Sequence, residues 1–384
     1  MQAYNYNDLY NKYVIDQATD ALQTGCVHNE SFIKIKEAHP VKLYTPNYFI
    51  RIALGLLTIV AVVFSGLLLW LISSASEDAS IITLLIILAA ICYVVLEVFV
   101  QKKNYYNAGV DNALMFMVLL FVTSTFFIPD NVSWILISGI VMLISLYLCV
   151  RFADAFMAIL SYGSLFIFLF LVYKKFGNIA KATAPLMMMV ISSVIYFIMK
   201  KLSAKTFLYK FCCEAIMFIT LITFYASGNY FIVKELSNEM FNLHLSLHDT
   251  VPFGWLFWIF TFLIPPAYII YGIKHKNFLF IRTGMGLIAA TVFTVKYYYA
   301  VLPVEMEMLI GGIILIALSY ALIKYLTISK HGYTSANLYP SKKEILNVEA
   351  LIIAETFNKQ PAQQTPGGLY GGGSGEGGGA TGEF

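Results

Sequence analysis

The chain has 384 residues, of which 59% are hydrophobic and only 12% are charged. A soluble domain carries roughly a quarter charged residues, so this composition excludes an ordinary soluble protein. The formal net charge of +3 comes from basic residues that flank apolar segments, so the sequence offers no basic face to a nucleic acid.

The segment 1–46 is polar and is predicted to form a cytoplasmic helical hairpin. Its two helices are expected at about 6–24 and 30–38, with Gly25 and Pro40 placed where helices end. The apolar residues of the first helix recur near helical spacing: Leu9, Tyr13, Ile15, Ala18 and Leu22. This hairpin either docks a protein partner or packs on the inner face of the bundle.

Apolar segments of about 20 residues follow the hairpin, and each is long enough to cross a hydrocarbon core about 30 Å thick. They are continuously apolar and do not alternate, which predicts helices and not barrel strands. We therefore predict an all-α, polytopic bundle in a transmembrane domain over 47–327. Its ten spans are expected at 49–73, 80–100, 109–128, 132–150, 154–173, 183–200, 207–227, 252–273, 278–301 and 304–326.

The basic residues of the loops predict the orientation, because cytoplasmic loops are enriched in lysine and arginine. With the N-terminus inside, the cytoplasmic connections hold Lys102, Lys103, Arg151, Lys200, Lys201, Lys205, Lys210, Lys274, Lys276 and Arg282. The opposite side holds Lys174, Lys175, Lys181 and Lys234. This asymmetry predicts a multi-pass protein of the cell inner membrane with both termini in the cytoplasm.

Three predicted spans begin alike, with "VDNALMF", "ADAFMAI" and "CEAIMFI". The repeated acid, followed by alanine and methionine, predicts a layer of charges near the inner membrane surface. The layer would contain Arg51, Glu97, Asp111, Arg151, Asp154, Glu214 and Arg282. Ionisable groups within spans usually face the bundle interior and are paired. The layer is therefore a structural belt of ion pairs, or a gate or proton-coupled site, unless the short pattern recurs by chance in similar apolar segments.

Lys296 lies inside the ninth predicted span, seven residues before Pro303. Pro303 suits the first position of the next helix, and Glu305 and Glu307 follow it in the first turn. Because the connection is short, the two spans must be antiparallel neighbours. We predict that Lys296 pairs with Glu307 or Glu305, either as a structural ion pair or as a substrate or ion site.

The external loop 228–251 contains His244 and His248, which stand four residues apart and could share a metal ion. The zinc-protease pattern needs a glutamate after the first histidine, and Leu245 is there instead. The other interpretation is an amphipathic helix on the outer interface. Its inward residues would be Phe231, Ile232, Leu236, Met240 and Phe241.

Other motifs predict little chemistry. No phosphate loop, nucleophile elbow, dinucleotide fingerprint or CxxC pair occurs in the sequence, so we expect no cofactor. The five cysteines lack paired spacing and are expected to act as small buried hydrophobes. Pro185 and the pair 265–266 interrupt predicted spans, where such residues either line a cavity or are satisfied by neighbouring helices.

The C-terminal part divides in two. Residues 328–359 form a cytoplasmic segment with a predicted amphipathic helix, "KKEILNVEALIIAETFNK". Residues 360–384 are predicted to be a flexible, glycine-rich tail. That tail resembles those of some bacterial membrane proteins, which are glycine-rich and end in an aromatic residue; the matching residues are 371–379, Ala380, Gly382 and Phe384.

The helical pair followed by about ten spans also resembles uncharacterised bacterial multi-pass membrane families. The likeness lies in "LYTPNYFIRIALGLLTIV" and "GGIILIALSYALIKYL", and it implies no activity. We predict a non-enzymatic scaffold or accessory component of the lipid bilayer that binds a membrane or cytoplasmic protein through the hairpin or tail. One alternative is a small-solute or ion transporter that uses the intramembrane charges. Another is a membrane enzyme that uses the outer histidines.

Overall fold

A computed structural model of the chain describes residues 3–23, 25–73, 81–129, 132–241 and 249–299, together with scattered positions between 306 and 327. Within these residues the chain forms helices and no strand, apart from one isolated bridge between Tyr44 and Tyr105. The predicted all-α class is therefore confirmed.

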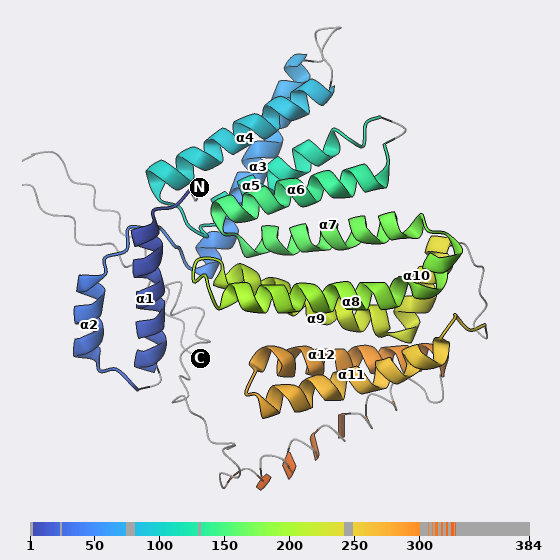
Figure 1. Cartoon of the computed structure of the whole chain (residues 1–384). Helices are drawn as coiled ribbons and strands as arrows, with labels where there is room; N and C mark the ends of the chain where they lie inside the picture. The colour runs from blue at the N-terminus through green and yellow to red at the C-terminus, as the bar shows by residue number, and fades with distance from the viewer. Residues whose placement is uncertain are drawn as a thin grey trace, which may run out of the picture. The chain divides into compact units, whose positions relative to one another are not determined.

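Figure 1 shows the helices in chain order. Their bounds are α1 (Tyr6–Gln23), α2 (Asn29–Ala38), α3 (Tyr48–Ser73), α4 (Ile81–Lys103), α5 (Val110–Ser124), α6 (Trp134–Phe152), α7 (Ala155–Lys174), α8 (Asn178–Ser203), α9 (Lys210–Gly228), α10 (Tyr230–Phe241), α11 (Gly254–Lys274) and α12 (Phe278–Tyr298).

Eight of these helices are long and apolar enough to cross a membrane: α3, α4, α6, α7, α8, α9, α11 and α12. The chain is thus a multi-pass membrane protein, and eight of the ten predicted spans correspond to these helices. The tenth, at 304–326, lies outside the described residues except for scattered positions.

The third predicted span, 109–128, is represented by α5, which is shorter than expected and ends at Ser124. Its last hydroxyl groups bond back to the preceding turn, as Thr123 Oγ1 donates to Leu119 O at 2.8 Å and Ser124 Oγ to Leu120 O at 2.8 Å. Phe126 N then donates to Thr123 O, three residues back, which replaces the α-helical pattern. The chain leaves the helix before it reaches Pro129.

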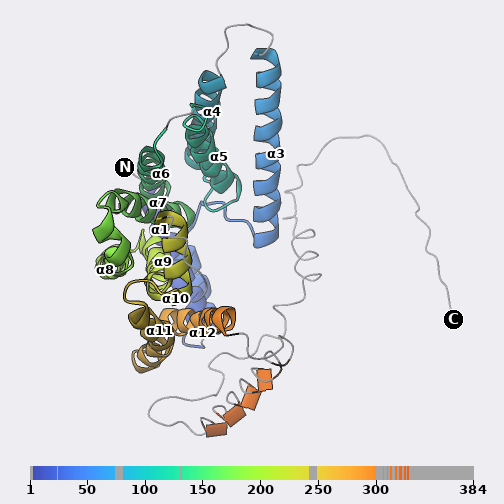
Figure 2. The ribbon, with the colours of Figure 1, turned by 90° about the vertical axis from the view of Figure 1, so that its right-hand side faces the viewer.

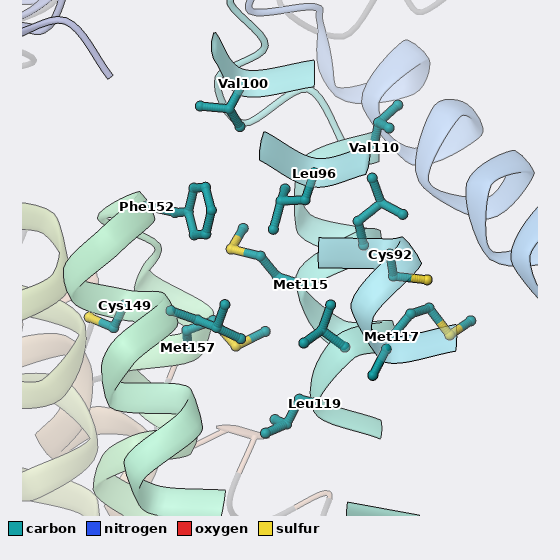
Figure 3. Packing of buried hydrophobic residues seen from close by; sticks show 14 of the residues in the cluster. Cys92, Leu96, Val100, Val110, Met115, Met117, Leu119, Cys149, Phe152 and Met157 are labelled. Atoms are coloured by element: carbon teal, nitrogen blue, oxygen red, sulfur yellow. The ribbon is translucent and has the colours of Figure 1, made fainter. Parts of the chain in front are cut away.

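The largest apolar core is centred on α5 and the helices around it. Leu96 of α4, Met115 of α5, and Phe152 of α6 are almost completely buried there (Figure 3). The short α5 therefore acts as a central packing helix. Helix α3 lies at the edge, beside α4 and α5 (Figure 2), and most of its surface is exposed apolar side chain.

The N-terminal helices form the predicted pair. Helix α1 is fixed to the bundle through Phe207, which lies in the connection between α8 and α9. Tyr6, Tyr10 and Tyr13 of α1 surround that ring, with centroid distances of 5.6, 5.8 and 5.5 Å. Helix α2 packs against α1 and has no buried residue.

Candidate functional site

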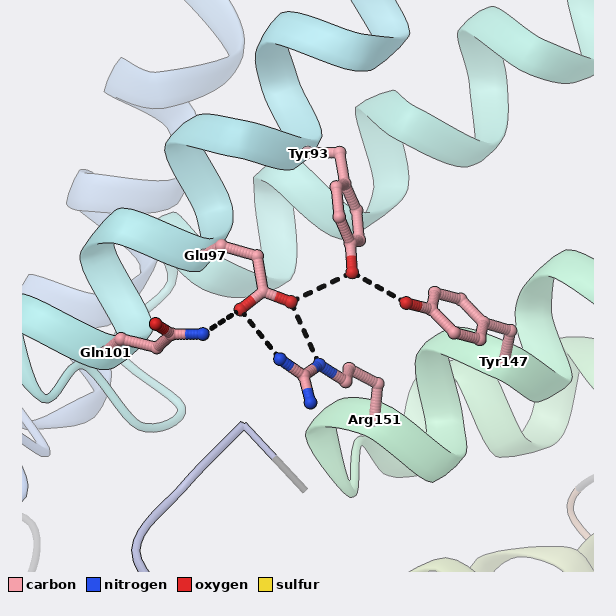
Figure 4. A network of polar contacts seen from close by, with 5 residues as sticks. All are labelled: Tyr93, Glu97, Gln101, Tyr147 and Arg151. Atoms are coloured by element: carbon pink, nitrogen blue, oxygen red, sulfur yellow. Dashed lines mark hydrogen bonds and ion pairs between the residues drawn. The ribbon is translucent and has the colours of Figure 1, made fainter. Parts of the chain in front are cut away.

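The clearest polar cluster joins α4 and α6 (Figure 4). The Arg151 guanidinium donates twice to Glu97, from Nε to Oε1 at 2.9 Å and from Nη2 to Oε2 at 3.1 Å. Tyr93 also donates to Glu97 Oε1 at 2.9 Å, and its hydroxyl meets that of Tyr147 at 2.7 Å. Gln101 donates to the other carboxylate oxygen. The carboxylate is thus held by four hydrogen bonds from two helices.

A second set of contacts links the starts of α3, α5 and α7. Asp154 accepts from Asn112 Nδ2 at 2.7 Å, and Arg51 donates from Nη2 to Asn112 Oδ1 at 3.3 Å. Arg51 also donates to Asn107 Oδ1 at 3.2 Å. Arg51 and Asp154 are therefore linked through the Asn112 amide. The sequence reasoning missed both asparagines, although Asn112 directly follows Asp111.

Local hydrogen bonds explain why two copies of the repeated pattern contain an aspartate. Asp154 caps α7 by accepting from Met157 N at 2.8 Å, and Asp111 accepts from Ala108 N at 2.9 Å beside the start of α5. Acidic side chains are favoured there because the first N–H groups of a helix lack intrahelical partners. The similarity of "VDNALMF" and "ADAFMAI" thus reflects two helix beginnings.

Both aspartates are deeply buried, with exposures of 1% for Asp111 and 6% for Asp154. Burial raises the pKa of the Asp154 carboxyl, the hydrogen bond from Met157 opposes that rise, and nearby Asp111 adds to it. The two carboxyl groups therefore share one poorly hydrated region.

The other predicted members lie apart from this cluster. Glu214 is on α9 and borders a cleft beneath α1 that Lys12, Asp16 and Lys210 also line. Arg282 lies near the start of α12 and is exposed. Within the described part of the chain, neither Glu214 nor Arg282 forms an ion pair with another member of the predicted layer.

The N-terminal segment covers the end of the bundle that carries the two clusters. Ala3 N donates to Arg151 O at 3.0 Å, and the buried Tyr4 ring meets Tyr106 edge-on at a centroid distance of 5.1 Å. Burial, together with the charges of Asp111 and Asp154, raises the pKa of the Tyr4 hydroxyl. The first residues of the chain thus help to keep water from these carboxylates.

The remaining candidate residues were predicted near the opposite end of the spans. Lys296 lies in the last turn of α12. Its proposed partners Glu305 and Glu307, and the proposed metal ligands His244 and His248, lie outside the described residues.

Helix α10 differs from the predicted amphipathic face. Leu236 is 47% exposed, whereas Val233, Lys234 and Ser237 are buried. The Lys234 ammonium lies 5.1 Å from the centroid of the Tyr298 ring, where a cation–π contact offsets part of its desolvation. Tyr298, which belongs to the run of tyrosines after Lys296, thus helps to accommodate Lys234. The sequence spacing did not indicate this contact.

Two apolar cavities of about 370 Å³ lie among α7 to α12. Pro185 lines the first, and Ala267 and Tyr268, which directly follow the 265–266 proline pair, line the second. Pro185 therefore borders a cavity, whereas neither proline of the 265–266 pair is among the lining residues. Charged side chains are missing from both linings, as far as the described residues show.

Three cysteines converge where α6 meets α9, which their sequence spacing did not reveal. The Cys149 and Cys212 side chains are neighbours in the same buried cluster, and Cys213 is adjacent to Cys212 in the sequence. All three thiols are free and buried.

This contact predicts a specific cross-link. A variant that keeps only Cys149 and Cys212, with a protease site inserted at 175–177, is expected to form an internal disulfide under diamide. Its two fragments should stay joined after cleavage on a non-reducing gel and separate with dithiothreitol. A variant that keeps Cys92 and Cys212 is the control, because Cys92 lies on α4, across the cluster from Cys149 (Figure 3). Equal cross-linking in both variants would contradict the α6–α9 packing.

Comparison with known protein families, with curated proteins and with solved structures gives no match. In the two polar clusters, Asp154 caps α7, Asp111 holds the turn before α5, and Glu97 and Arg151 tie α4 to α6.

Proposed function

We propose that the protein is a non-enzymatic membrane scaffold that uses α2 to hold a protein partner. The observation that carries the proposal is the position of α2. It is an ordered helix without a buried residue, held by α1 at the margin of the bundle (Figure 1). Apolar side chains normally drive such a helix into a core, yet Ile33 is 55% exposed.

The mounting of α2 supports a presenting role. Asn11 of α1 donates from Nδ2 to Pro40 O at 2.9 Å, and its Oδ1 lies 3.1 Å from His39 Nδ1. These contacts fix the end of α2 to α1, which is itself fixed by Phe207. A partner would therefore meet a helix whose position is set before binding, which lowers the entropy cost of association.

The interior of the bundle also favours a scaffold over a transporter. Glu97 and Arg151 neutralise each other, and Asp111 and Asp154 accept backbone N–H groups. The two apolar cavities are lined without these charges. A polar solute would find no continuous polar lining in them.

Photo-cross-linking in cells tests the role of α2. Benzoylphenylalanine at Ile33 is expected to give one protein adduct of defined mass. The matched control is Ile86 of α4, which is also 55% exposed and should face lipid. In the protein without the probe, Ile33→Asp should abolish any phenotype that the gene supports while leaving the melting temperature unchanged. Absence of a protein adduct at position 33, or an unchanged phenotype in Ile33→Asp, would reject the proposal.

The inner-membrane location and the cytoplasmic termini belong to this proposal. Their support is the distribution of lysine and arginine between the two sets of loops. In a cysteine-free protein in intact cells, an impermeant maleimide should label a cysteine at the exposed Lys175 and leave one at the exposed Lys103 unlabelled. The opposite pattern would place α2 outside the cell.

An ion transporter is the second candidate, and the buried Asp111 and Asp154 favour it. Two carboxyl groups in one poorly hydrated region can bind a proton. Proteoliposomes distinguish the candidates. A scaffold should leave an imposed pH gradient unchanged, whereas a transporter should dissipate it and lose that activity in Asp154→Asn.

A further inference from the structure

The first apolar cavity lies between α7, α8, α9 and α10. Its volume is about 370 Å³, within the range of small-molecule sites. The lining is aliphatic and aromatic except for Ser227 and Ser237. An apolar cavity of this size excludes ordered water, because water needs polar partners there.

A short helix and small side chains at its border explain why the cavity is left open. Three walls come from spanning helices, but the fourth comes from α10, which has only 12 residues. On α10 the lining residues recur at helical spacing and form one stripe: Ile232, Val233, Leu236, Ser237 and Met240. On α8, Pro185 and the small Ala184 leave the space that a larger side chain would fill.

The cavity is bordered by residues that are also exposed on the spanning helices. Ile167 of α7 is 54% exposed and Leu236 of α10 is 47% exposed, and both belong to the lining. In a membrane, the medium that meets these side chains is hydrocarbon. A hydrocarbon chain can therefore enter from the bilayer without crossing water.

One end of the cavity is close to basic residues. Ile167, Phe170 and Leu171 of α7 line the cavity. Lys174 follows one helical turn after Phe170 and Leu171, so it lies on the same face of α7. The exposed Lys175 follows at the helix C-cap. The ammonium groups of these lysines attract an anion, and a phosphate group is the anion that membranes supply.

We propose that this cavity binds one acyl chain of an anionic phospholipid, whose phosphate lies at Lys174 and Lys175. The apolar lining selects the chain, and the two lysines select the charge of the headgroup. The proposal does not depend on the scaffold role. It also gives the basic 174–181 connection, which opposes the overall charge asymmetry, a reason to lie where it does.

Native mass spectrometry of the detergent-purified full chain tests this site. The probes are phosphatidylglycerol and phosphatidylcholine with identical chains. The protein is expected to retain one phosphatidylglycerol molecule about tenfold more tightly than phosphatidylcholine. Lys174→Gln combined with Lys175→Gln should reduce this preference to about twofold or less without abolishing retention of either lipid. A fatty acid of the same chain length, bound as tightly as phosphatidylglycerol, would reject the phospholipid assignment.

Variants that fill the cavity provide a second test of the lipid site. Ala226→Leu adds volume to the lining and should lower lipid retention about tenfold. The matched control is Ala61→Leu on α3, where the side chain is exposed. Should Ala226→Leu lower the melting temperature, Met240→Trp fills the same cavity from α10. Retention that is unchanged in the filled variants would overturn the proposal.

A photoreactive lipid locates the chain in the unmodified protein. Phosphatidylglycerol with a diazirine near the end of one chain should label peptides that contain 184–188 or 232–240. Labelling spread equally over α3 and α4 would show only lipid at the outer surface and would reject the site.

Discussion

Gly109→Ala is expected to destabilise the protein by about 3 kcal/mol or more, measured as a lower melting temperature in detergent. Gly109 has φ of 92° at the start of α5, a conformation that L-residues with a side chain rarely adopt. An added Cβ would also overlap the Arg51 carbonyl group of α3, with its carbonyl carbon at 2.9 Å. Because the carbonyl carbon and oxygen of Arg51 are backbone atoms, α3 would have to move away from α5.

Two other glycines serve as controls for this prediction. At Gly55, which faces Gly109 from α3, an added Cβ would lie 3.4 Å from Gly109 O, at the edge of ordinary contact. At Gly163 in α7 it would meet nothing within 4 Å. Gly55→Ala should therefore cost little, and Gly163→Ala should be neutral or stabilise α7 by up to about 1 kcal/mol. Equal stability of all three variants would contradict the close approach of α3.

The sequence predicts the helices well because apolar length and continuity alone determine whether a helix can span a membrane. Eight expected spans correspond to observed helices, and their bounds differ by only a few residues. The third differs because the hydroxyl groups of Thr123 and Ser124 compete for backbone carbonyls. The hydropathy of the sequence does not reveal this local competition for hydrogen bonds.

The sequence named charged residues of the candidate site but did not show how they contact one another. Asp111 and Asp154 lie at the starts of α5 and α7, and Glu97 and Arg151 form an ion pair between α4 and α6. Sequence spacing could not show that Asn112 stands between Asp154 and Arg51, because that link depends on how three helices pack. Glu214 shares the pattern yet borders the cleft beneath α1.

Other features arise only from tertiary packing. The contact between Cys149 and Cys212 joins α6 to α9, and no local pattern in the sequence brings those helices together. Lys234 was assigned to an external loop, whereas the structure buries it on α10 beside Tyr298. A buried lysine needs an aromatic or acidic neighbour, and this neighbour comes from α12.

Breaking the Glu97–Arg151 pair is expected to have the second large effect. Arg151→Met should destabilise the protein by about 3 kcal/mol, because it leaves a partly buried carboxylate without its cation. The side chains are only 24% and 17% exposed for Arg151 and Glu97, so water compensates little of this loss. Glu97→Gln should cost less, since the amide still accepts from Arg151 and Tyr93.

The double variant decides whether the pair is structural. Glu97→Met with Arg151→Met removes both charges, and it should recover most of the stability lost in Arg151→Met, because neither desolvated charge remains. A coupling free energy of about 2 kcal/mol is expected from thermal unfolding of the four proteins. A structural pair also requires the double variant to keep the cellular function. If the double variant is stable and folded but inactive, the charges themselves act in function, and the network in Figure 4 becomes part of a proton or ion path.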